Sequence, residues 1–291
     1  MANLKEIRTR ITSVNSTKKI TSAMKMVAAA KLRKAQNAIT QMRPYAEKLH
    51  EILEHVISSA ENLEDNVYTQ MRSAEKVLII IIASNKGLCG AFNSNAVKKA
   101  AELIENEYSE LNKQGKVDIY SVGKTINDLL RTKHIEVTES HSDIYNNLNF
   151  KTVSELAEKA MSLFEQKQYD KVHIVYNKFK NAAVQIPQTE QFLPIQLNES
   201  EETFEGDYIY EPDKDQIVEQ LIPYALKIQL YKAVLDSYAA EHGARMTAMH
   251  KATDNATELL KELRLTYNKA RQAAITNEIL EIVGGAEALN N

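Results

Sequence analysis

The first sixty residues carry an apolar repeat with alternating steps of three and four residues. The repeat consists of Leu4, Ile7, Ile11 and Val14, followed further along by Ala28, Leu32, Ala35, Ile39, Met42, Ala46, Leu49, Leu53 and Val56. Such steps place side chains on one face of an α-helix, so the pattern predicts a helix over about 3–58. A helix with one narrow apolar face packs against a partner helix.

One stretch of this apolar face is polar. Three successive positions of the same register hold Lys18, Thr21 and Lys25. Burying unpaired ammonium groups is costly, so here the helices are expected to separate, to rotate or to meet an acidic partner.

The last eighty residues supply a second helix. After Pro212, which suits the first turn of a helix, apolar residues recur at helical spacing, with Thr253 as the polar exception. Gly284-Gly285 is expected to end this helix. The second helix is then longer than the first by about 16 residues of roughly 1.5 Å each. Its surplus end, residues 270–283, is rich in apolar groups, which predicts enclosure by other subunits.

The middle of the chain predicts a small α/β domain between the two helices. The run Val77–Ala83 is continuously apolar and suits a strand covered on both faces. Further strands are expected at 117–122 and 171–179, helices at 93–111, 125–131 and 153–166, and edge strands at 182–194 and 208–210.

The predicted fold class is therefore α/β with long helices: an antiparallel coiled coil of the terminal helices plus an inserted, small Rossmann-like α/β domain. The expected divisions are a helix at 1–58, a linker at 59–75, the α/β base domain at 76–211 and a helix at 212–291.

Charge is unevenly distributed, although the net charge is only -3. Residues 1–46 carry ten Lys or Arg against one acid, and residues 199–215 carry eight acids against one base. The basic end suits an acidic protein, a nucleic acid or an anionic membrane. No aromatic residue lies between Met1 and Arg43, which argues against a nucleic-acid partner bound by stacking.

Little in the sequence indicates chemistry. The loop Ser84–Gly90 follows a predicted strand but lacks the spacing of a dinucleotide site or a P-loop, so a tight turn is the favoured interpretation over a nucleotide site. Cys89 is expected to be partly buried rather than reactive. The histidines, His242 among them, form no ligand cluster and are expected to face solvent. No catalytic residue, cofactor site or metal site is therefore predicted.

The longest apolar run is much shorter than the roughly 20 residues that span a bilayer, so the protein is expected to be soluble or peripherally attached. The single cysteine excludes an intrachain disulfide and fits a reducing compartment. Three functions remain open on these residues alone: a shaft enclosed by other subunits, a free-standing coiled-coil scaffold with an α/β binding domain, and an enzyme with a nucleotide site at Ser84–Gly90.

The sequence resembles the gamma subunits of F-type ATP synthases over essentially its whole length. The most specific stretch is Tyr267-Asn-Lys-Ala-Arg-Gln-Ala-Ala-Ile-Thr-Asn-Glu-Ile279. The other stretches that carry the resemblance are Ile7–Val14, Thr17–Met24, Met26–Lys34, Ser84–Gly90, Ala244–Met249, Ala252–Asn255 and Ile282–Ala286.

The resemblance implies a central rotor shaft that couples ion-driven rotation of a membrane ring to conformational changes at catalytic beta subunits. The implied partners are the alpha and beta subunits, the epsilon subunit and the c-subunit ring, with no nucleic acid and with the membrane reached only through the complex. It implies a non-catalytic subunit without cofactors. The implied location is peripheral, on the cytoplasmic face of the bacterial inner membrane.

The resemblance also implies contact residues. Lys18, Lys19 and Met24 fall where family members face acidic loops of the beta subunits. Contacts with other beta-subunit loops are implied for Arg271, Gln272 and Thr276, with Arg245 on the same coupling face. Contacts at the base with epsilon and the membrane ring are implied for Tyr208, Tyr210 and Glu211.

Overall fold

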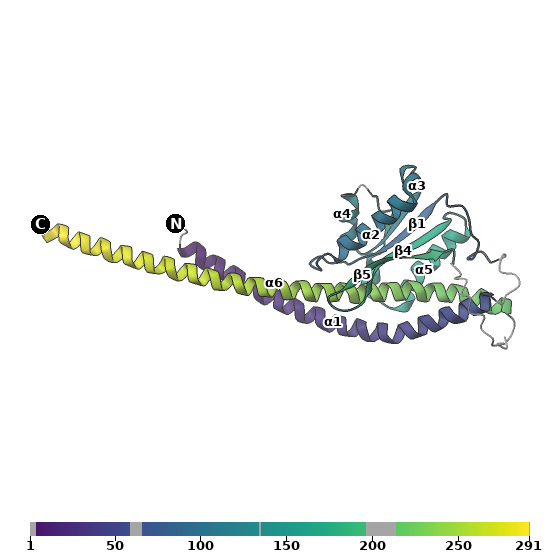
Figure 1. The fold of residues 1–291 in the computed structure, drawn as a ribbon, viewed down its shortest axis with the longest axis horizontal. Helices are drawn as coiled ribbons and strands as arrows, with labels where there is room; N and C mark the ends of the chain where they lie inside the picture. Colours follow the sequence, from purple (N-terminus) through teal and green to yellow (C-terminus); the bar gives the residue numbers. More distant parts are fainter. Residues whose placement is uncertain (1–3, 59–65, 134, 196–213, 291) are drawn as a thin grey trace. The chain divides into compact units, whose positions relative to one another are not determined.

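The computed structural model describes residues 4–58, 66–133, 135–195 and 214–290. Two long helices, α1 over Leu4–Ser58 and α6 over Lys214–Asn290, precede and follow an α/β region along the chain (Figure 1). This confirms the predicted fold class. The chain divides into two compact units, one of residues 1–28 with 246–291 and one of residues 29–245, so each long helix contributes to both. The division of the chain at 58, 75 and 211 stays a prediction.

The α/β region lies within the unit of residues 29–245. Its strands are β1 Val77–Ile82, β2 Val117–Val122, β3 Glu139–Ser140, β4 Lys171–Phe179 and β5 Gln185–Leu193. Its helices are α2 Phe92–Glu107, α3 Ser109–Lys113, α4 Thr125–Arg131, the short 3-10 helix Ser142–Asn146 and α5 Phe150–Glu165.

The strands form one sheet in the order β3-β2-β1-β4-β5. Strands β1 to β4 are mutually parallel, and β5 runs antiparallel to β4 at one edge. The chain moves from β1 outward to β2 and then returns to place β4 on the other side of β1. The order therefore reverses between β1 and β4, and this is the topological switch point of the sheet.

Both faces of β1 are covered, as its continuous apolar sequence predicts. Val77, Ile79 and Ile81 point into a core formed with α2 and α4, while alternate residues point into a second core with α5, α1 and α6. All six residues of β1 are buried. Because successive strand residues face opposite sides, an apolar run of this kind can be buried only between two layers.

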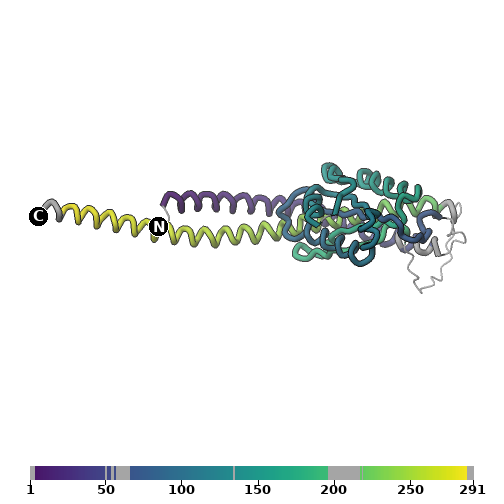
Figure 2. The backbone as a smooth tube through the Cα atoms, turned by 90° about the horizontal axis from the view of Figure 1, so that it is seen from above, coloured from purple at the N-terminus to yellow at the C-terminus, as the bar shows by residue number. Residues whose placement is uncertain are grey.

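In the other unit, α1 and α6 run side by side as an antiparallel pair (Figures 1 and 2). Thr21 of α1 lies opposite Thr253 of α6. Leu4 lies 17 residues before Thr21, and the residue 17 positions after Thr253 is Ala270. The part of α6 beyond Ala270 therefore has no facing turn of α1, and Figure 2 shows α6 continuing past the start of α1.

The predicted apolar face of α1 is the face that packs. Its buried members are Ile7, Ala28, Leu32, Ala35, Ile39, Leu49, Leu53 and Val56. Strands β2 and β4 and helix α4 have the predicted bounds, and β5 is the predicted edge strand. The expected strand at 208–210 lies outside the described residues.

Three details differ from the prediction. Helix α6 continues through Gly284-Gly285 to Asn290, because two glycines cost only about 1 kcal/mol each and good helix formers follow them. The expected helix over 93–111 is divided at Tyr108, whose backbone leaves the helical region at φ -127°. Strand β3 was not predicted; it pairs only two residues of β2 and has no sequence pattern of its own.

Candidate functional site

The polar stretch of the helix pair contains a hydrogen bond between the two helices. Thr21 is only 9% exposed, and its hydroxyl lies 2.8 Å from that of Thr253. Lys18 and Lys25 are half-buried, and neither forms an ion pair among the residues that the structure describes. The threonine pair thus closes the seam, while the flanking ammonium groups remain available to an acidic partner.

The face of α1 around this stretch is partly apolar as well as basic. Lys19 is exposed and Met24 is half-buried, so the structure places both of these predicted contact residues at the surface. Beside them lie three exposed apolar side chains, which are Ile20, Met26 and Val27. Exposed apolar groups clustered on one short helical stretch are typical of a surface that another chain covers.

The end of α6 is the larger exposed apolar surface. The predicted contact residues Arg271, Gln272 and Thr276 are all exposed, and they share one helical segment. The exposed apolar residues around and beyond them are Leu265, Ile275, Ile279, Leu280, Ile282 and Val283, of which Ile282 reaches 70% exposure. We call residues 265–283 the α6 tip. The predicted apolar end of the second helix is thus confirmed to be exposed in the isolated chain.

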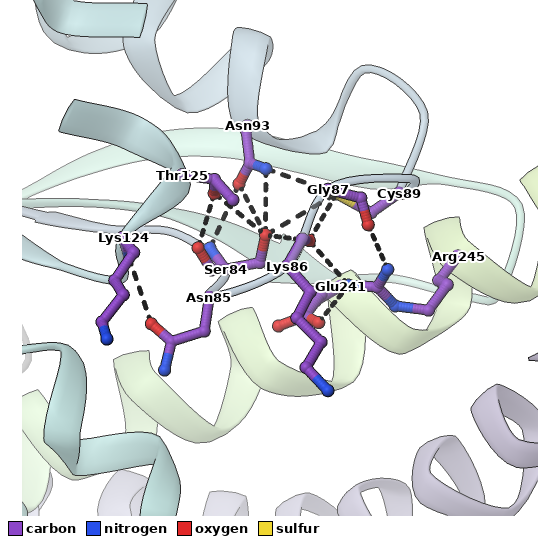
Figure 3. A network of polar contacts seen from close by, with 10 residues as sticks. All are labelled: Ser84, Asn85, Lys86, Gly87, Cys89, Asn93, Lys124, Thr125, Glu241 and Arg245. Atoms are coloured by element: carbon purple, nitrogen blue, oxygen red, sulfur yellow. Dashed lines mark hydrogen bonds and ion pairs between the residues drawn. The ribbon is translucent and has the colours of Figure 1, made fainter. Parts of the chain in front are cut away.

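Arg245 occupies a different environment from the other predicted contact residues. It is only 7% exposed. Its guanidinium donates to the backbone carbonyls of Lys86, at 2.9 Å, and Gly87, and to a carboxylate oxygen of Glu241, at 2.6 Å (Figure 3). Three acceptors therefore hold this side chain inside the chain, where it joins α6 to the loop after β1.

A second set of hydrogen bonds fixes the same loop from the sheet side (Figure 3). The amide oxygen of Asn93, on α2, accepts from the backbone N–H of Ser84, at 3.1 Å. Thr125 donates its hydroxyl to the carbonyl oxygen of Ser84, at 2.5 Å, and Asn85 accepts from the backbone N–H of Lys124. Between these anchors Leu88 has a left-handed φ of 63° and is 65% exposed. Asn93 also donates to the sulfur of Cys89, so the loop is held on both sides of Leu88, which forms an exposed apolar tip.

Helix α6 covers one face of the sheet, and its stretch from Ser237 to Gly243 passes the carboxyl ends of β1 and β4. Ser237 approaches the carbonyl oxygen of Ile82, the last residue of β1, at 3.5 Å. A Cβ added at Gly243 would lie 3.2 Å from the Cα of Ala182, just after β4. Open parallel sheets bind ligands outside this switch point. Here a stretch of the chain's own helix passes that place, and the missing side chain of Gly243 avoids a tight contact with Ala182.

The ionisable groups at this junction are buried. Burial raises the pKa of Glu241, and Arg245 opposes that shift by stabilising the carboxylate. Burial, with Lys31 and Arg245 nearby, lowers the pKa of His242 to about 4. His242 is only 4% exposed, so the prediction that it faces solvent was wrong. The apolar spacing of α6 alone did not show that this face of the helix is buried.

Cys89 belongs to the same loop and is buried, as predicted. Burial raises the pKa of its thiol, which keeps it in the unreactive protonated form. Among the residues that the structure describes, no group of three or more His, Cys, Asp or Glu side chains is arranged to hold a metal ion.

The predicted base contacts Tyr208, Tyr210 and Glu211 lie outside the described residues. Within the described part of the chain, no helix is both long and apolar enough to cross a membrane.

Comparisons with known proteins agree over the full length. A family model described as ATP synthase matches residues 3–289. The ATP synthase gamma chain of Christiangramia forsetii is 57% identical over 290 residues, and that of Flavobacterium johnsoniae is 58% identical over 291 residues; each alignment covers 100% of both chains. A chain in a solved structure of the Euglena gracilis mitochondrial ATP synthase OSCP/F1/c-ring has a TM-score of 0.69 at 23% identity, covering 98% of this chain and 94% of that chain. At this identity, the structural match shows the fold.

Proposed function

The chain belongs to the ATP synthase gamma-chain family, and from this premise we propose that its helix pair transmits rotation to the catalytic subunits. It is a central stalk subunit of an F-type ATP synthase. In the proposed mechanism, ion flow turns a membrane ring, the α/β region turns with the ring, and the α6 tip turns inside the alpha and beta subunits.

The observation that carries this mechanism is the exposed α6 tip. Among the residues that the structure describes, none of α1 faces the helix beyond Ala270, yet its side chains there include Ile275, Ile279 and Leu280. Burying an aliphatic side chain of this size contributes about 1.5–3 kcal/mol. A surrounding ring of subunits supplies that burial, whereas a scaffold that works alone gains nothing from an apolar free end.

Two further surfaces are proposed as contacts with beta subunits. Lys18, Lys19 and Met24 are proposed to face acidic beta-subunit loops, supported by the two lysines and the exposed apolar residues beside them. Arg271, Gln272 and Thr276 are proposed to meet a second set of loops, supported by their exposure on the α6 tip.

Arg245 stays a proposed residue of the coupling face, but its burial changes how it is proposed to act. Its guanidinium already binds Glu241 and the carbonyls of Lys86 and Gly87. We therefore propose that Arg245 holds the loop after β1 in the position from which Leu88 is presented to a partner.

The base of the subunit is proposed to contact epsilon and the c-subunit ring through Tyr208, Tyr210 and Glu211, on the resemblance to the family alone. The chain is proposed to be non-catalytic and without a cofactor. It is proposed to sit peripherally on the cytoplasmic face of a bacterial inner membrane, reaching the membrane only through the complex.

Co-purification tests the proposal. A tagged chain, expressed in its native cell, is expected to bring down alpha and beta subunits in a three-three-one ratio, together with epsilon. Recovery of the chain without those subunits would favour the scaffold. Micromolar binding of ATP or NAD to the purified chain, measured by calorimetry, would favour the nucleotide-site enzyme.

Charge reversal tests the proposed lysine contacts. In the purified complex, Lys18→Glu with Lys19→Glu is expected to weaken ATP-driven ion pumping relative to ATP hydrolysis, because acidic groups then face acidic loops. Lys113→Glu with Lys116→Glu, on exposed positions of the α/β region, is the matched control. Normal pumping in the first variant would remove the electrostatic contact from the mechanism.

A further inference from the structure

Arg43 connects three elements at one point. It lies on α1, and its Nη2 atom donates to the carbonyl oxygen of Phe179 at 2.8 Å and to Oδ1 of Asp236 at 2.7 Å. Phe179 is the last residue of β4, and Asp236 lies on α6. One guanidinium nitrogen therefore ties α1 to α6 and to the carboxyl end of the central sheet.

The tie is made in an interior environment. The side chain of Asp236 is 0% exposed and that of Arg43 is 33% exposed. Burial raises the pKa of Asp236, and the Arg43 guanidinium opposes that shift. Buried ion pairs of this kind add little net stability compared with apolar side chains of similar size, because desolvation offsets the attraction. Their value is directional, since a hydrogen-bonded pair specifies one relative position of the elements that it joins.

Most of the neighbouring contacts between α1 and α6 lack that directionality; the hydroxyl of Tyr45 also donates to that of Tyr224, at 3.0 Å, but both of these side chains are exposed. The packed face of α1 near Arg43 consists of aliphatic side chains such as Ile39 and Leu49. Apolar packing is roughly proportional to the area buried and is non-directional, so it resists separation of two helices better than it resists their sliding or rotation. A helix pair that transmits torque needs resistance to both of those motions.

We propose that Arg43 is a positioning residue that locks α1 to α6 and to β4, so that rotation of the α/β region is delivered to both helices together. This inference rests on the proposed function as a rotor shaft. Arg43 touches no nucleotide in this role; it acts through the two helices that it holds in register.

Variants of Arg43 in the purified complex test the inference. Arg43→Met removes the tie but leaves Asp236 buried and unpaired, which lowers stability by itself. Arg43→Met with Asp236→Leu removes both charges and is expected to fold, since both partners become apolar. Arg43→Lys keeps the charge with a single donor group. Arg131→Met, an exposed arginine of α4, is the matched control.

The readout is ion pumping per ATP hydrolysed, with complex assembly and thermal unfolding measured alongside. The double variant is expected to assemble and to hydrolyse ATP at the control rate while losing pumping, and Arg43→Lys is expected to recover part of the pumping. A merely structural role predicts instead that the double variant, once folded, pumps like the control, and that result would overturn the inference.

A separate measurement decides the case in which the double variant does not assemble. Amide hydrogen exchange on the full chain is then expected to increase at the end of β4 and in the turn of α6 around Asp236. Unchanged exchange in both places would overturn the inference. Failure of the unmodified chain to join a complex would instead contradict the proposed function, so the two failures are distinguishable.

Discussion

The hydroxyl oxygens of Thr21 in α1 and Thr253 in α6 lie 2.8 Å apart at the polar position of an otherwise apolar helix seam. Each hydroxyl also has an acceptor in its own helix, the carbonyl oxygen of Lys18 at 3.1 Å and that of Met249 at 2.8 Å. Two hydroxyl protons serve three contacts. At any moment, therefore, one of the three goes without a proton, and the pair can switch between arrangements without leaving a buried donor unpaired.

Removal of this pair is expected to have a small, non-additive effect on stability. Thr21→Val and Thr253→Val each lose one inter-helix hydrogen bond, while the remaining hydroxyl keeps its acceptor within its own helix. A double-mutant cycle by urea unfolding is expected to show a coupling energy of about 0.5–1 kcal/mol. Thr17→Val, whose hydroxyl donates to the carbonyl oxygen of Ser13 in its own helix, is the control and is expected within about 0.5 kcal/mol of the parent. Full additivity would contradict the inter-helix bond.

Arg245→Met is expected to be far more damaging. It leaves the carboxylate of Glu241 buried and two carbonyls of the loop after β1 without their donor. Breaking one side of a buried pair costs about 3–5 kcal/mol, measurable as a lower free energy of unfolding. Adding Glu241→Leu is expected to recover much of that loss, whereas Arg131→Met is expected to be nearly neutral. A stability loss for Arg245→Met as small as that of Arg131→Met would show that the contacts are weak.

Acidification is expected to destabilise the chain through His242. Its pKa is about 4 in the folded chain, below the ordinary value of about 6.5 for an unfolded histidine. The unfolded chain thus takes up the proton first, and the stability present above pH 6.5 is lost as the pH falls from 6.5 to about 4. Between pH 7 and 4.5 this amounts to roughly 2–3 kcal/mol. From pH 7 to 4.5, the free energy of unfolding of His242→Gln is expected to fall less than that of the parent, and the difference is about that amount. Equal losses in both chains would contradict the burial of a neutral imidazole.

Truncation is expected to separate folding from assembly. A chain ending at Lys269 lacks most of the α6 tip, whose side chains are exposed in the isolated chain. The free energy of unfolding of its α/β region is therefore expected to lie within about 0.5 kcal/mol of the parent value. Complex yield or ATP-driven rotation is expected to fall. A chain ending at Val283 keeps the tip and serves as the control. Unchanged rotation in the shorter chain would show that the tip contacts are dispensable.

Local patterns predicted much of this fold because its elements depend mainly on local periodicity. The six-residue apolar strand β1 has only one stable environment, between two covered faces, so its place in a parallel sheet followed from its sequence. The seam of α1 was equally predictable, since its buried residues repeat every three or four positions.

What was missed depends on partners far away in the chain. Arg43 meets Phe179 and Asp236, which are 136 and 193 residues distant, and no spacing rule relates them. The same holds for Tyr108, where the predicted helix is divided: its hydroxyl lies 2.7 Å from Nε2 of His173, 65 residues later. Of the implied contact residues, Arg245 was recognised by motif, but its burial became apparent only from the packing of α6 on the sheet.

At the switch point of the sheet, where open parallel sheets bind separate molecules, this domain packs against a helix of its own chain. Arg245, Gly243 and Ser237 lie beside the carboxyl ends of the strands and the loop after β1, and they are covalently connected to the domain that holds them. Intramolecular association is governed by an effective concentration set by the connecting chain, and it does not change when the protein is diluted. This junction therefore persists at any protein concentration, whereas every contact of α6 with another subunit depends on how much of that subunit is present.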